Sequence, residues 1–233
     1  MKILWAITGA GHLLKESIHV IDELSQKHEI TIALSNAGLE VVKKYGYMTK
    51  LEEIRDKKPE NMIVCDEDEK YSYPLSGKIT HEKYDLIIVS PTTANTTAKI
   101  VHAIADTLVT NIVAQSGKGR IPLLIVPVDQ KEGIITTKIP PYIKKDACQK
   151  CEECKPGNIC PKKAINPPNI NTIQCINCMK CRNKCPHNAL ITDKEIELYI
   201  RKIDAENTAK LEEIENIKTI FHPEDILEED VLN

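Results

Sequence analysis

The chain has 233 residues, of which 28% are charged and 42% hydrophobic, and its formal net charge is −3. This length allows one sizeable domain, or one domain with a small module, and the net charge gives no signature of a nucleic-acid-binding protein. No apolar run is long enough to cross a membrane, and the run at residues 3–7 has the length of a buried strand, not of a signal sequence. We therefore expect a cytoplasmic protein that contacts neither nucleic acid nor a membrane.

The first half of the chain alternates apolar strands with helices. Strands are predicted at residues 2–8, 29–35, 85–90 and 121–127. The helix after the first strand carries Leu14, Ile18, Ile21 and Leu24 on one face, and further helices are predicted at residues 38–45, 95–105 and 106–115. Residues 46–84 show little periodicity beyond the apolar run 62–65. The alternation predicts an α/β fold with a doubly wound parallel sheet, whose ligands bind beyond the carboxyl ends of the strands.

Eight of the nine cysteines follow in two runs, spaced C-x2-C-x2-C-x5-C-P and C-x2-C-x2-C-x3-C-P. Three cysteines at two-residue intervals can bind three corners of an iron–sulfur cube, and in two-cluster ferredoxins the cysteine before proline binds the other cube. We therefore expect two [4Fe–4S] clusters. One is bound by Cys148, Cys151, Cys154 and Cys185, and the other by Cys175, Cys178, Cys181 and Cys160.

Other interpretations of the cysteines are weaker. The first run has two extra residues before Cys160, and the Pro-Gly turn within residues 155–159 can absorb them. A disulfide framework is disfavoured because only Cys65 lies outside the two runs and no signal sequence is present. A zinc site commonly uses four ligands, often with histidine. Cys65 has no partner at ligand spacing and is interpreted as an ordinary strand or loop residue.

The α/β pattern resumes after the cysteines. A helix is predicted at residues 204–215, a strand at 217–221, and a solvated surface helix in the acidic tail from residue 223. The cysteine-rich segment is therefore predicted to be an insertion. Residues 1–145 and 193–233 form one domain in this interpretation, and residues 146–192 form a ferredoxin-like module that the metal holds together, because so small a module has almost no core.

Residues 90–100 read SPTTANTTAKI, and Thr-Gly-Ala-Gly at residues 8–11 ends the first strand. Together with Ser35 after the second strand and the pattern at residues 207–221, they resemble the homo-oligomeric flavin-containing flavoproteins, which include cysteine decarboxylases, prenyl-flavin synthases and archaeal flavoproteins. The resemblance covers about residues 1–130 and 196–226. It implies a Rossmann-like flavoprotein domain at residues 1–145 that binds FMN at a subunit interface, commonly within a homotrimer or a multiple of trimers.

The resemblance also implies which residues contact the FMN. Glycines let backbone amides approach a phosphate, a helix N-terminus favours its negative charge, and short polar side chains can reach the ribityl chain or the ring. Each of these residues could instead be a helix cap or a turn residue. The implied FMN contacts are Thr8, Gly9, Ala10, Gly11, Ser35, Pro91, Thr92, Thr93, Ala94, Asn95 and Thr96.

The chain departs from the decarboxylases of this family at two places. Those enzymes carry a Pro-x-Met-Asn-like segment where this chain has PVDQ at residues 127–130. They also have a catalytic histidine before the third strand, and the candidate here, His81, lies about one helical turn too near that strand. Both departures argue against cysteine decarboxylation. His12 and Asp129 are the candidate proton donors, although His12 could equally be a capping or surface group.

Archaeal iron–sulfur flavoproteins of the family resemble this chain in residues 5–14 and in the inserted cysteine module. That resemblance implies reduction of 7,8-dihydromethanopterin to tetrahydromethanopterin, the C1 carrier of methanogens, with electrons passing from reduced ferredoxin or a similar donor through the clusters to FMN. Two alternatives stay open: an electron-transfer flavoprotein without a small-molecule substrate, and a decarboxylase or flavin-modifying enzyme. The basic residues around the cysteines are either an ordinary solvated surface or a docking face for an acidic ferredoxin.

Overall fold

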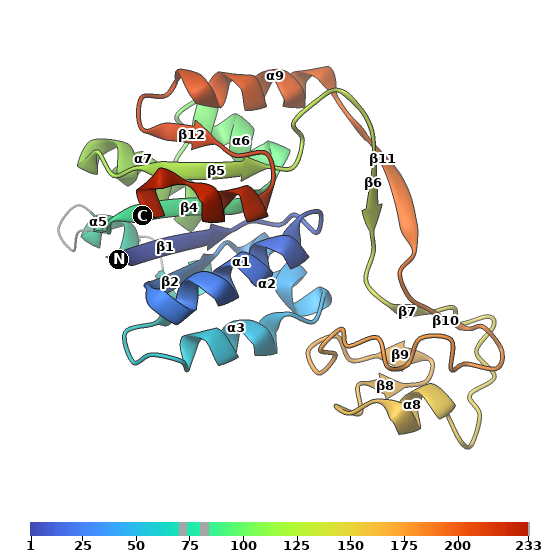
Figure 1. The fold of residues 1–233 in the computed structure, drawn as a ribbon. Helices are drawn as coiled ribbons and strands as arrows, with labels where there is room; N and C mark the ends of the chain where they lie inside the picture. The colour runs from blue at the N-terminus through green and yellow to red at the C-terminus, as the bar shows by residue number, and fades with distance from the viewer. Residues whose placement is uncertain (70–73, 80–83, 233) are drawn as a thin grey trace.

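The computed structural model describes residues 1–69, 74–79 and 84–232, and its centre is a six-stranded parallel sheet (Figure 1). The strand order is β12-β5-β4-β1-β2-β3, and every neighbouring pair is parallel. The predicted doubly wound α/β fold is therefore confirmed. The strands are β1 (Lys2–Ile7), β2 (Glu29–Leu34), β3 (Met62–Cys65), β4 (Leu86–Thr92), β5 (Leu123–Pro127) and β12 (Ile217–Thr219).

Helices cover both faces of the sheet. Side chains alternate between the two faces of a strand, so Ile3 and Trp5 of β1 pack toward α1 and α3, whereas Leu4 and Ala6 pack toward α5 and α7. These residues are fully buried. The helices of this domain are α1 (Leu14–Lys27), α2 (Asn36–Lys44), α3 (Met48–Arg55), α4 (Asp66–Glu69), α5 (Pro74–Lys78), α6 (Ala94–Val101), α7 (Leu108–Gly119), α9 (Lys202–Lys210) and the 3-10 helix η1 (Leu211–Glu213).

The apolar run at residues 62–65 forms the edge strand β3, whose residues are exposed or partly buried, and α3 lies in the weakly patterned stretch before it. One expectation for this domain needs correction. The acidic tail is not a solvated helix. It forms the 3-10 helices η2 (Pro223–Glu228) and η3 (Asp230–Leu232), and η2 packs on α1 because Ile226 is fully buried there.

The cysteine-rich segment is connected to the sheet through an antiparallel ribbon of β6 (Gly133–Lys138) and β11 (Glu195–Ile200). Figure 1 shows this ribbon leading from the carboxyl ends of the parallel strands to the lobe that contains α8 (Lys155–Ile159). The lobe contains two short strand pairs, β7 (Tyr142–Ile143) with β10 (Leu190–Ile191) and β8 (Ile165–Asn166) with β9 (Asn169–Ile170). Apolar residues of the ribbon such as Ile134 and Tyr199 are exposed to solvent. The ribbon therefore lacks the hydrophobic pattern of a buried strand and was not predicted from the sequence.

The order of the strands reverses between β1 and β4, and open α/β sheets bind ligands in the crevice at such a switch point. β1 pairs with β2 on one side and with β4 on the other. The chain segments that leave β1 and β4 therefore border the expected crevice. In the part of the chain that the structure describes, no helix is both long and apolar enough to cross a bilayer.

Gly38 allows the first turn of α2 to pack on the end of β1. A Cβ atom at this position would overlap the backbone oxygen of Ile7. We expect Gly38→Ala to lower the free energy of unfolding by about 1–3 kcal/mol or more, because a backbone shift is needed to relieve the overlap. Chemical denaturation would measure the change. Gly77→Ala is the control, since an added Cβ there meets nothing within 4 Å, and a loss of similar size in both variants would contradict the packing explanation.

Candidate functional site at the carboxyl edge of the sheet

The loops after β1 and β4 are held together by the side chain of Thr8. Its hydroxyl donates to the Pro91 carbonyl oxygen at 2.8 Å and accepts from the Thr93 backbone N–H at 2.9 Å. The Thr8 backbone N–H donates to the same carbonyl at 3.2 Å. Thr8 is buried, so its hydroxyl is fully used inside the protein and positions the two loops.

The turn at residues 9–11 presents backbone donors to its surroundings. Among the described residues, none accepts a hydrogen bond from the backbone N–H groups of Gly9, Ala10 or Gly11. Positions 9 and 11 have no room for a side chain. A Cβ at Gly9 would lie 2.7 Å from the Ala37 Cβ, and one at Gly11 would overlap the Tyr45 hydroxyl. Unpaired backbone donors on a turn of two glycines and one alanine fit the phosphate of a nucleotide such as FMN.

Two helix N-termini flank this turn. Ser35 caps α2 by accepting from the Gly38 N–H at 3.0 Å, and Thr93 caps α6 by accepting from the Thr96 N–H at 3.2 Å. The Thr92 hydroxyl is fully buried and donates to the Val89 carbonyl at 2.8 Å, so it points away from the turn. Pro91 and Thr96 are also buried, Thr93 and Ala94 are partly exposed, and Asn95 is exposed. Ala94 and Asn95 at the start of α6 are therefore the accessible part of this segment.

His12 and Asp129, the two candidate proton donors, lie close enough to shift each other's pKa. Burial lowers the pKa of His12, although the nearby carboxylates of Glu16 and Asp129 act in the opposite direction. Burial and the charge of Asp204 raise the pKa of Asp129, while the Ala94 N–H that donates to its carboxylate opposes this shift. The sequence separates these residues by more than a hundred positions, and the sheet brings them to one edge.

Three further residues lie around this pair and were not predicted from the sequence. His222, just after β12, faces His12 closely enough to lower its pKa. Arg201 forms a two-pronged ion pair with Asp204, with nitrogen–oxygen distances of 2.7 and 2.8 Å, and this guanidinium holds the pKa of Asp204 below its usual range. All three follow the cysteine module in the chain. In that part of the sequence, the only signal for the site was the weak family pattern at residues 207–221. The predicted candidate His81 lies outside the described residues.

Two cavities adjoin the glycine turn on the side of the cysteine-rich lobe. One, of about 370 Å³, contains Gly11, His12, Tyr45, Tyr47 and Asn177 among its lining residues. The other, of about 610 Å³, lies between Gly9 and Gly11 on one side and the segments 139–145 and 168–172 on the other. Both volumes are within the range of small-molecule sites. The turn is therefore open toward the lobe, with room for a cofactor or substrate.

The second cysteine run forms a compact group with Cys160, as the spacing predicts. Cys160, Cys175, Cys178 and Cys181 line one small cavity. Burial raises the pKa of Cys175 and of Cys181, and the neighbouring thiols of Cys160 and Cys178 add to both shifts. This convergence fits the predicted ligand set of one cluster.

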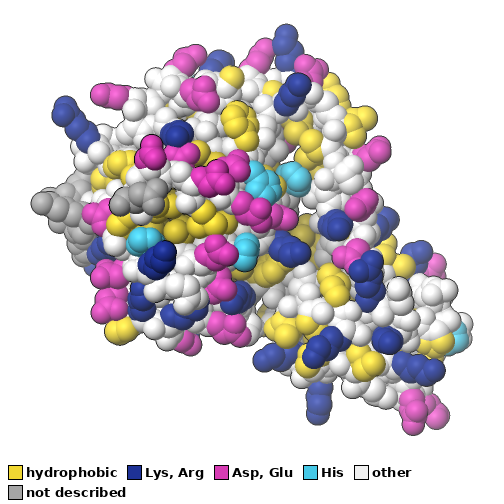
Figure 2. All heavy atoms as spheres, viewed as in Figure 1, with side chains coloured by type: hydrophobic (Ala, Val, Ile, Leu, Met, Phe, Trp, Pro, Cys, Tyr) yellow, Lys and Arg dark blue, Asp and Glu magenta, His cyan; other side chains and the backbone are white. Residues whose placement is uncertain are grey.

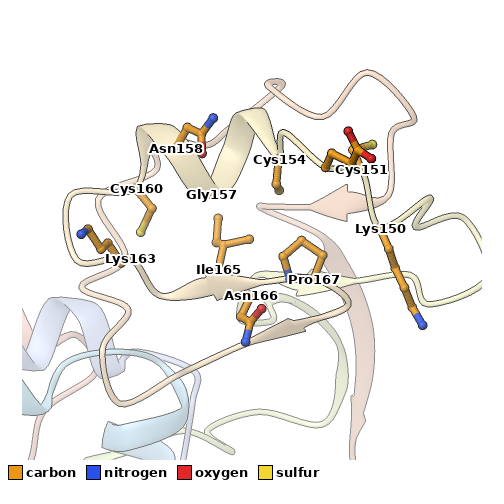
Figure 3. A pocket seen from close by; sticks show the side chains of 11 residues that line it. Lys150, Cys151, Cys154, Gly157, Asn158, Cys160, Lys163, Ile165, Asn166 and Pro167 are labelled. Atoms are coloured by element: carbon orange, nitrogen blue, oxygen red, sulfur yellow. The ribbon is translucent and has the colours of Figure 1, made fainter.

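The first run lines a different cavity of about 620 Å³ beside α8 (Figure 3). Cys151 and Cys154 border it together with Cys160, whereas Cys148 and Cys185 do not. This cavity therefore does not bring Cys185 together with the first run, as the predicted ligand set requires. Partial burial of the Cys185 sulfur acts to raise its pKa. Hydrogen bonds from backbone N–H groups, among them that of Ala189, outweigh this effect, so the pKa of Cys185 is lowered.

The two halves of the module repeat one local structure. The Ala164 N–H donates to the Cys160 sulfur at 3.3 Å, and the Ala189 N–H donates likewise to Cys185. Within residues 146–192, all of which the structure describes, only Pro156, Ala164 and Ala189 are buried. A segment with so little core fits the expectation that bound clusters hold it together.

Among the described residues no three His, Cys, Asp or Glu side chains converge on a single-ion site. In a cubane each thiolate binds a different iron, so its ligands stand farther apart.

Comparison with known proteins gives one family. A model of the family described as "Flavoprotein" matches residues 1–138. The chain is 47% identical to the dihydromethanopterin reductase (acceptor) of Methanocaldococcus jannaschii, over 98% of this chain and 95% of that protein. It is 37% identical to the protein of the same name from Methanosarcina mazei, over 97% and 98% of the two chains. A crystal structure of Burkholderia xenovorans DmrB in complex with FMN, described as a cubic protein cage for redox transfer, has a TM-score of 0.63 at 23% identity and covers 97% of this chain and 91% of that one. At that identity, this last likeness shows the fold alone.

Proposed function

The chain belongs to the flavoprotein family, and from that premise we propose that this oxidoreductase reduces 7,8-dihydromethanopterin to tetrahydromethanopterin. In the proposed reaction, FMN binds at the glycine turn, and electrons come from a ferredoxin-type donor through two [4Fe–4S] clusters. Reduction of the C6=N5 imine consumes two electrons and two protons and forms one C–H and one N–H bond. FMN, when bound, accepts electrons singly and delivers them in pairs.

One observation carries the proposal. The open glycine turn, with its unpaired backbone donors, adjoins the same cavities as the cysteine-rich lobe. A decarboxylase or a flavin-modifying enzyme needs no external electrons, so it would gain nothing from thiolate sets next to its flavin turn. The substrate class follows from the two reductases that resemble this chain over nearly its full length.

The residues of this chain would bind the cofactor and hold the proton. Gly9, Ala10 and Gly11 would bind the phosphate through their backbone N–H groups, and Asn95 would contact the rest of the cofactor. Asp129 is suited to donate the proton, because its raised pKa keeps its carboxyl group protonated at higher pH than an ordinary aspartate. His12, whose pKa is lowered, would remain largely neutral near pH 7 and orient the pterin.

The test is a single-turnover measurement on anaerobically prepared protein. We expect fully reduced protein, mixed with dihydromethanopterin, to be reoxidised rapidly and to yield tetrahydromethanopterin. Stopped-flow absorbance would follow the flavin and clusters, and product analysis would identify the pterin. No reoxidation by the pterin, together with fast exchange with a protein carrier, would leave an electron-transfer flavoprotein. We also expect a homotrimer or a multiple of trimers by light scattering.

A further inference from the structure

The cysteine-rich lobe touches the α/β domain at the turn between α2 and α3, here called the α2–α3 corner (Tyr45, Gly46 and Tyr47). Gly46 is buried with a φ of 76°, and a Cβ atom there would overlap the Cys175 carbonyl oxygen. The Asn177 side chain lies 3.5 Å from the Tyr47 hydroxyl as a hydrogen-bond donor. Figure 1 shows the loop of the second run reaching this corner.

The same corner touches the glycine turn. The Tyr45 hydroxyl fills the space where a Cβ of Gly11 would be, and it donates to the Lys138 carbonyl at 3.4 Å. The cavity that contains His12 is lined by the corner and also by Asn177 and Met179, which lie between the cysteines of the second run. The second run and the glycine turn are therefore neighbours on either side of the corner.

The first run lies away from this contact. Within the described parts of the chain, no hydrogen bond or ion pair joins residues 148–154 to residues 1–132, and the cavity that Cys151 and Cys154 border has no lining residue from 1–132. Cys151 and Cys178 are both exposed, but α8, which follows the first run, lies on the side of the lobe remote from the sheet (Figure 1). The two cysteine sets thus differ in what they face.

The lobe as a whole carries an excess of basic residues, and the first run is flanked by lysines as well as by Asp146, Glu152 and Glu153. Residues 146–192 contain seven Lys and Arg but three Asp and Glu, although the whole chain has a net charge of −3. In Figure 2 the Lys and Arg side chains gather on this lobe. At the second run, Arg182 is paired with Asp193 at 3.3 Å, whereas Lys180 and Lys184 are exposed and form no ion pair within the described residues. Four exposed lysines around the first run form no ion pair within the described residues: Lys150, Lys155, Lys162 and Lys163.

We propose that the two cysteine sets act in a fixed order. The outer set (Cys148, Cys151, Cys154 and Cys185) takes electrons from an acidic one-electron iron–sulfur protein that docks on the four lysines. The inner set (Cys160, Cys175, Cys178 and Cys181) passes them across the α2–α3 corner toward the glycine turn. Each transfer oxidises one donor by one electron, and two transfers supply the pair that one substrate consumes. This order of electron transfer rests on the proposed function for the presence of the clusters and FMN. It concerns only the route by which electrons reach the glycine turn.

Two matched variants test the order. Cys151→Ser and Cys178→Ser each replace the exposed middle cysteine of one run, and iron analysis with electron paramagnetic resonance would establish that one cluster remains. Reduced ferredoxin is then mixed with each variant in the absence of pterin. We expect the remaining cluster to be reduced at near the wild-type rate in Cys178→Ser but at least about tenfold more slowly in Cys151→Ser. Flavin bleaching should slow in both.

The opposite pattern, or equal rates in the two variants, would overturn the order. Because no pterin is present, a wild-type protein that fails to reduce dihydromethanopterin would refute the proposed function without affecting these rates. Higher salt should slow reduction of the outer cluster if lysines guide docking.

A second pair of variants covers the case in which a cysteine variant fails to assemble its module. We expect Gly46→Ala to push the second run from the α2–α3 corner, and so to raise hydrogen–deuterium exchange at residues 175–179 and slow flavin bleaching by ferredoxin, at unchanged iron content. Gly77→Ala, where the added Cβ meets nothing, should match the wild type in all three measurements. Unchanged exchange and unchanged bleaching in Gly46→Ala would overturn the role of the corner.

Discussion

Replacing Thr8 by valine is expected to lower the free energy of unfolding by about 1–3 kcal/mol, because the Thr93 N–H loses its acceptor and the Pro91 carbonyl loses one of its two donors. The Thr8 hydroxyl is bonded both to the Pro91 carbonyl and to the Thr93 N–H, and the valine methyl can bond to neither. Chemical denaturation measures this loss. We also expect weaker FMN binding, followed by flavin fluorescence, since the two loops that border the glycine turn would no longer be tied together.

Thr8→Ser is the matched control, because serine keeps the hydroxyl and removes only a methyl group. It should retain most of the stability and most of the FMN affinity. If Thr8→Val and Thr8→Ser behave alike, the hydroxyl does not hold the loops, and the assignment of Thr8 as a positioning residue is wrong.

Asp129→Asn is expected to reduce pterin turnover by about 10²–10⁴-fold, the range for loss of a general acid. Flavin reduction by the donor should be unaffected, because it uses no proton from Asp129. Asparagine can still accept the Ala94 N–H, so the local structure should persist. Single-turnover kinetics separates the two steps, and Asp129→Glu, which restores a carboxyl group, should recover part of the turnover. Full turnover in Asp129→Asn would exclude Asp129 as the proton donor.

The same variant has a pH signature in stability. The pKa of Asp129 is raised in the folded protein, mainly by burial, so the folded state binds this proton more tightly than the unfolded state. Its contribution to stability is fully present below the ordinary aspartate pKa and is lost as pH rises through the raised value. Asp129→Asn should therefore melt at the same or a higher temperature than wild type at about pH 7, and lose this advantage at about pH 4. A lower melting temperature at neutral pH would contradict the shift.

The sequence predicted the central strands well because burial on both faces leaves a continuous apolar run. β1, β2 and β5 lie within predicted strands, and β4 begins within one but continues two residues beyond it, to Thr92. The edge strand β3 has a short apolar run, whereas β6 and β11 of the ribbon have none. The pairing partners of these three strands were not predictable from local pattern. The family resemblance carried by residues 8–11 and 90–100 is confirmed by the match to the flavoprotein family.

The site was predictable as a location but not as a set of contacts. The strand order brings Thr8 and the segment after Ser90 to one edge of the sheet. The direction of each hydroxyl, however, depends on the pleat of the strand: the Thr92 hydroxyl points into the core, whereas that of Thr93 caps α6. The contact of Gly46 with Cys175 joins positions far apart in the chain and depends on a left-handed backbone at the glycine. Neither the contact nor the α2–α3 corner has a local signature in the sequence.

The ribbon has a consequence for how the protein matures. During synthesis the cysteines emerge before β12, the strand that completes the sheet against β5. Six residue pairs of β6 and β11 hold the ends of residues 139–194 together, and the entropic cost of closing a loop rises only slowly with its length. The sheet is therefore expected to close around an insertion that is still unfolded and iron-free. With the proposed clusters, metal loading would be a late, post-folding event, and iron-starved cells should accumulate a flavin-binding apoprotein ready for cluster delivery.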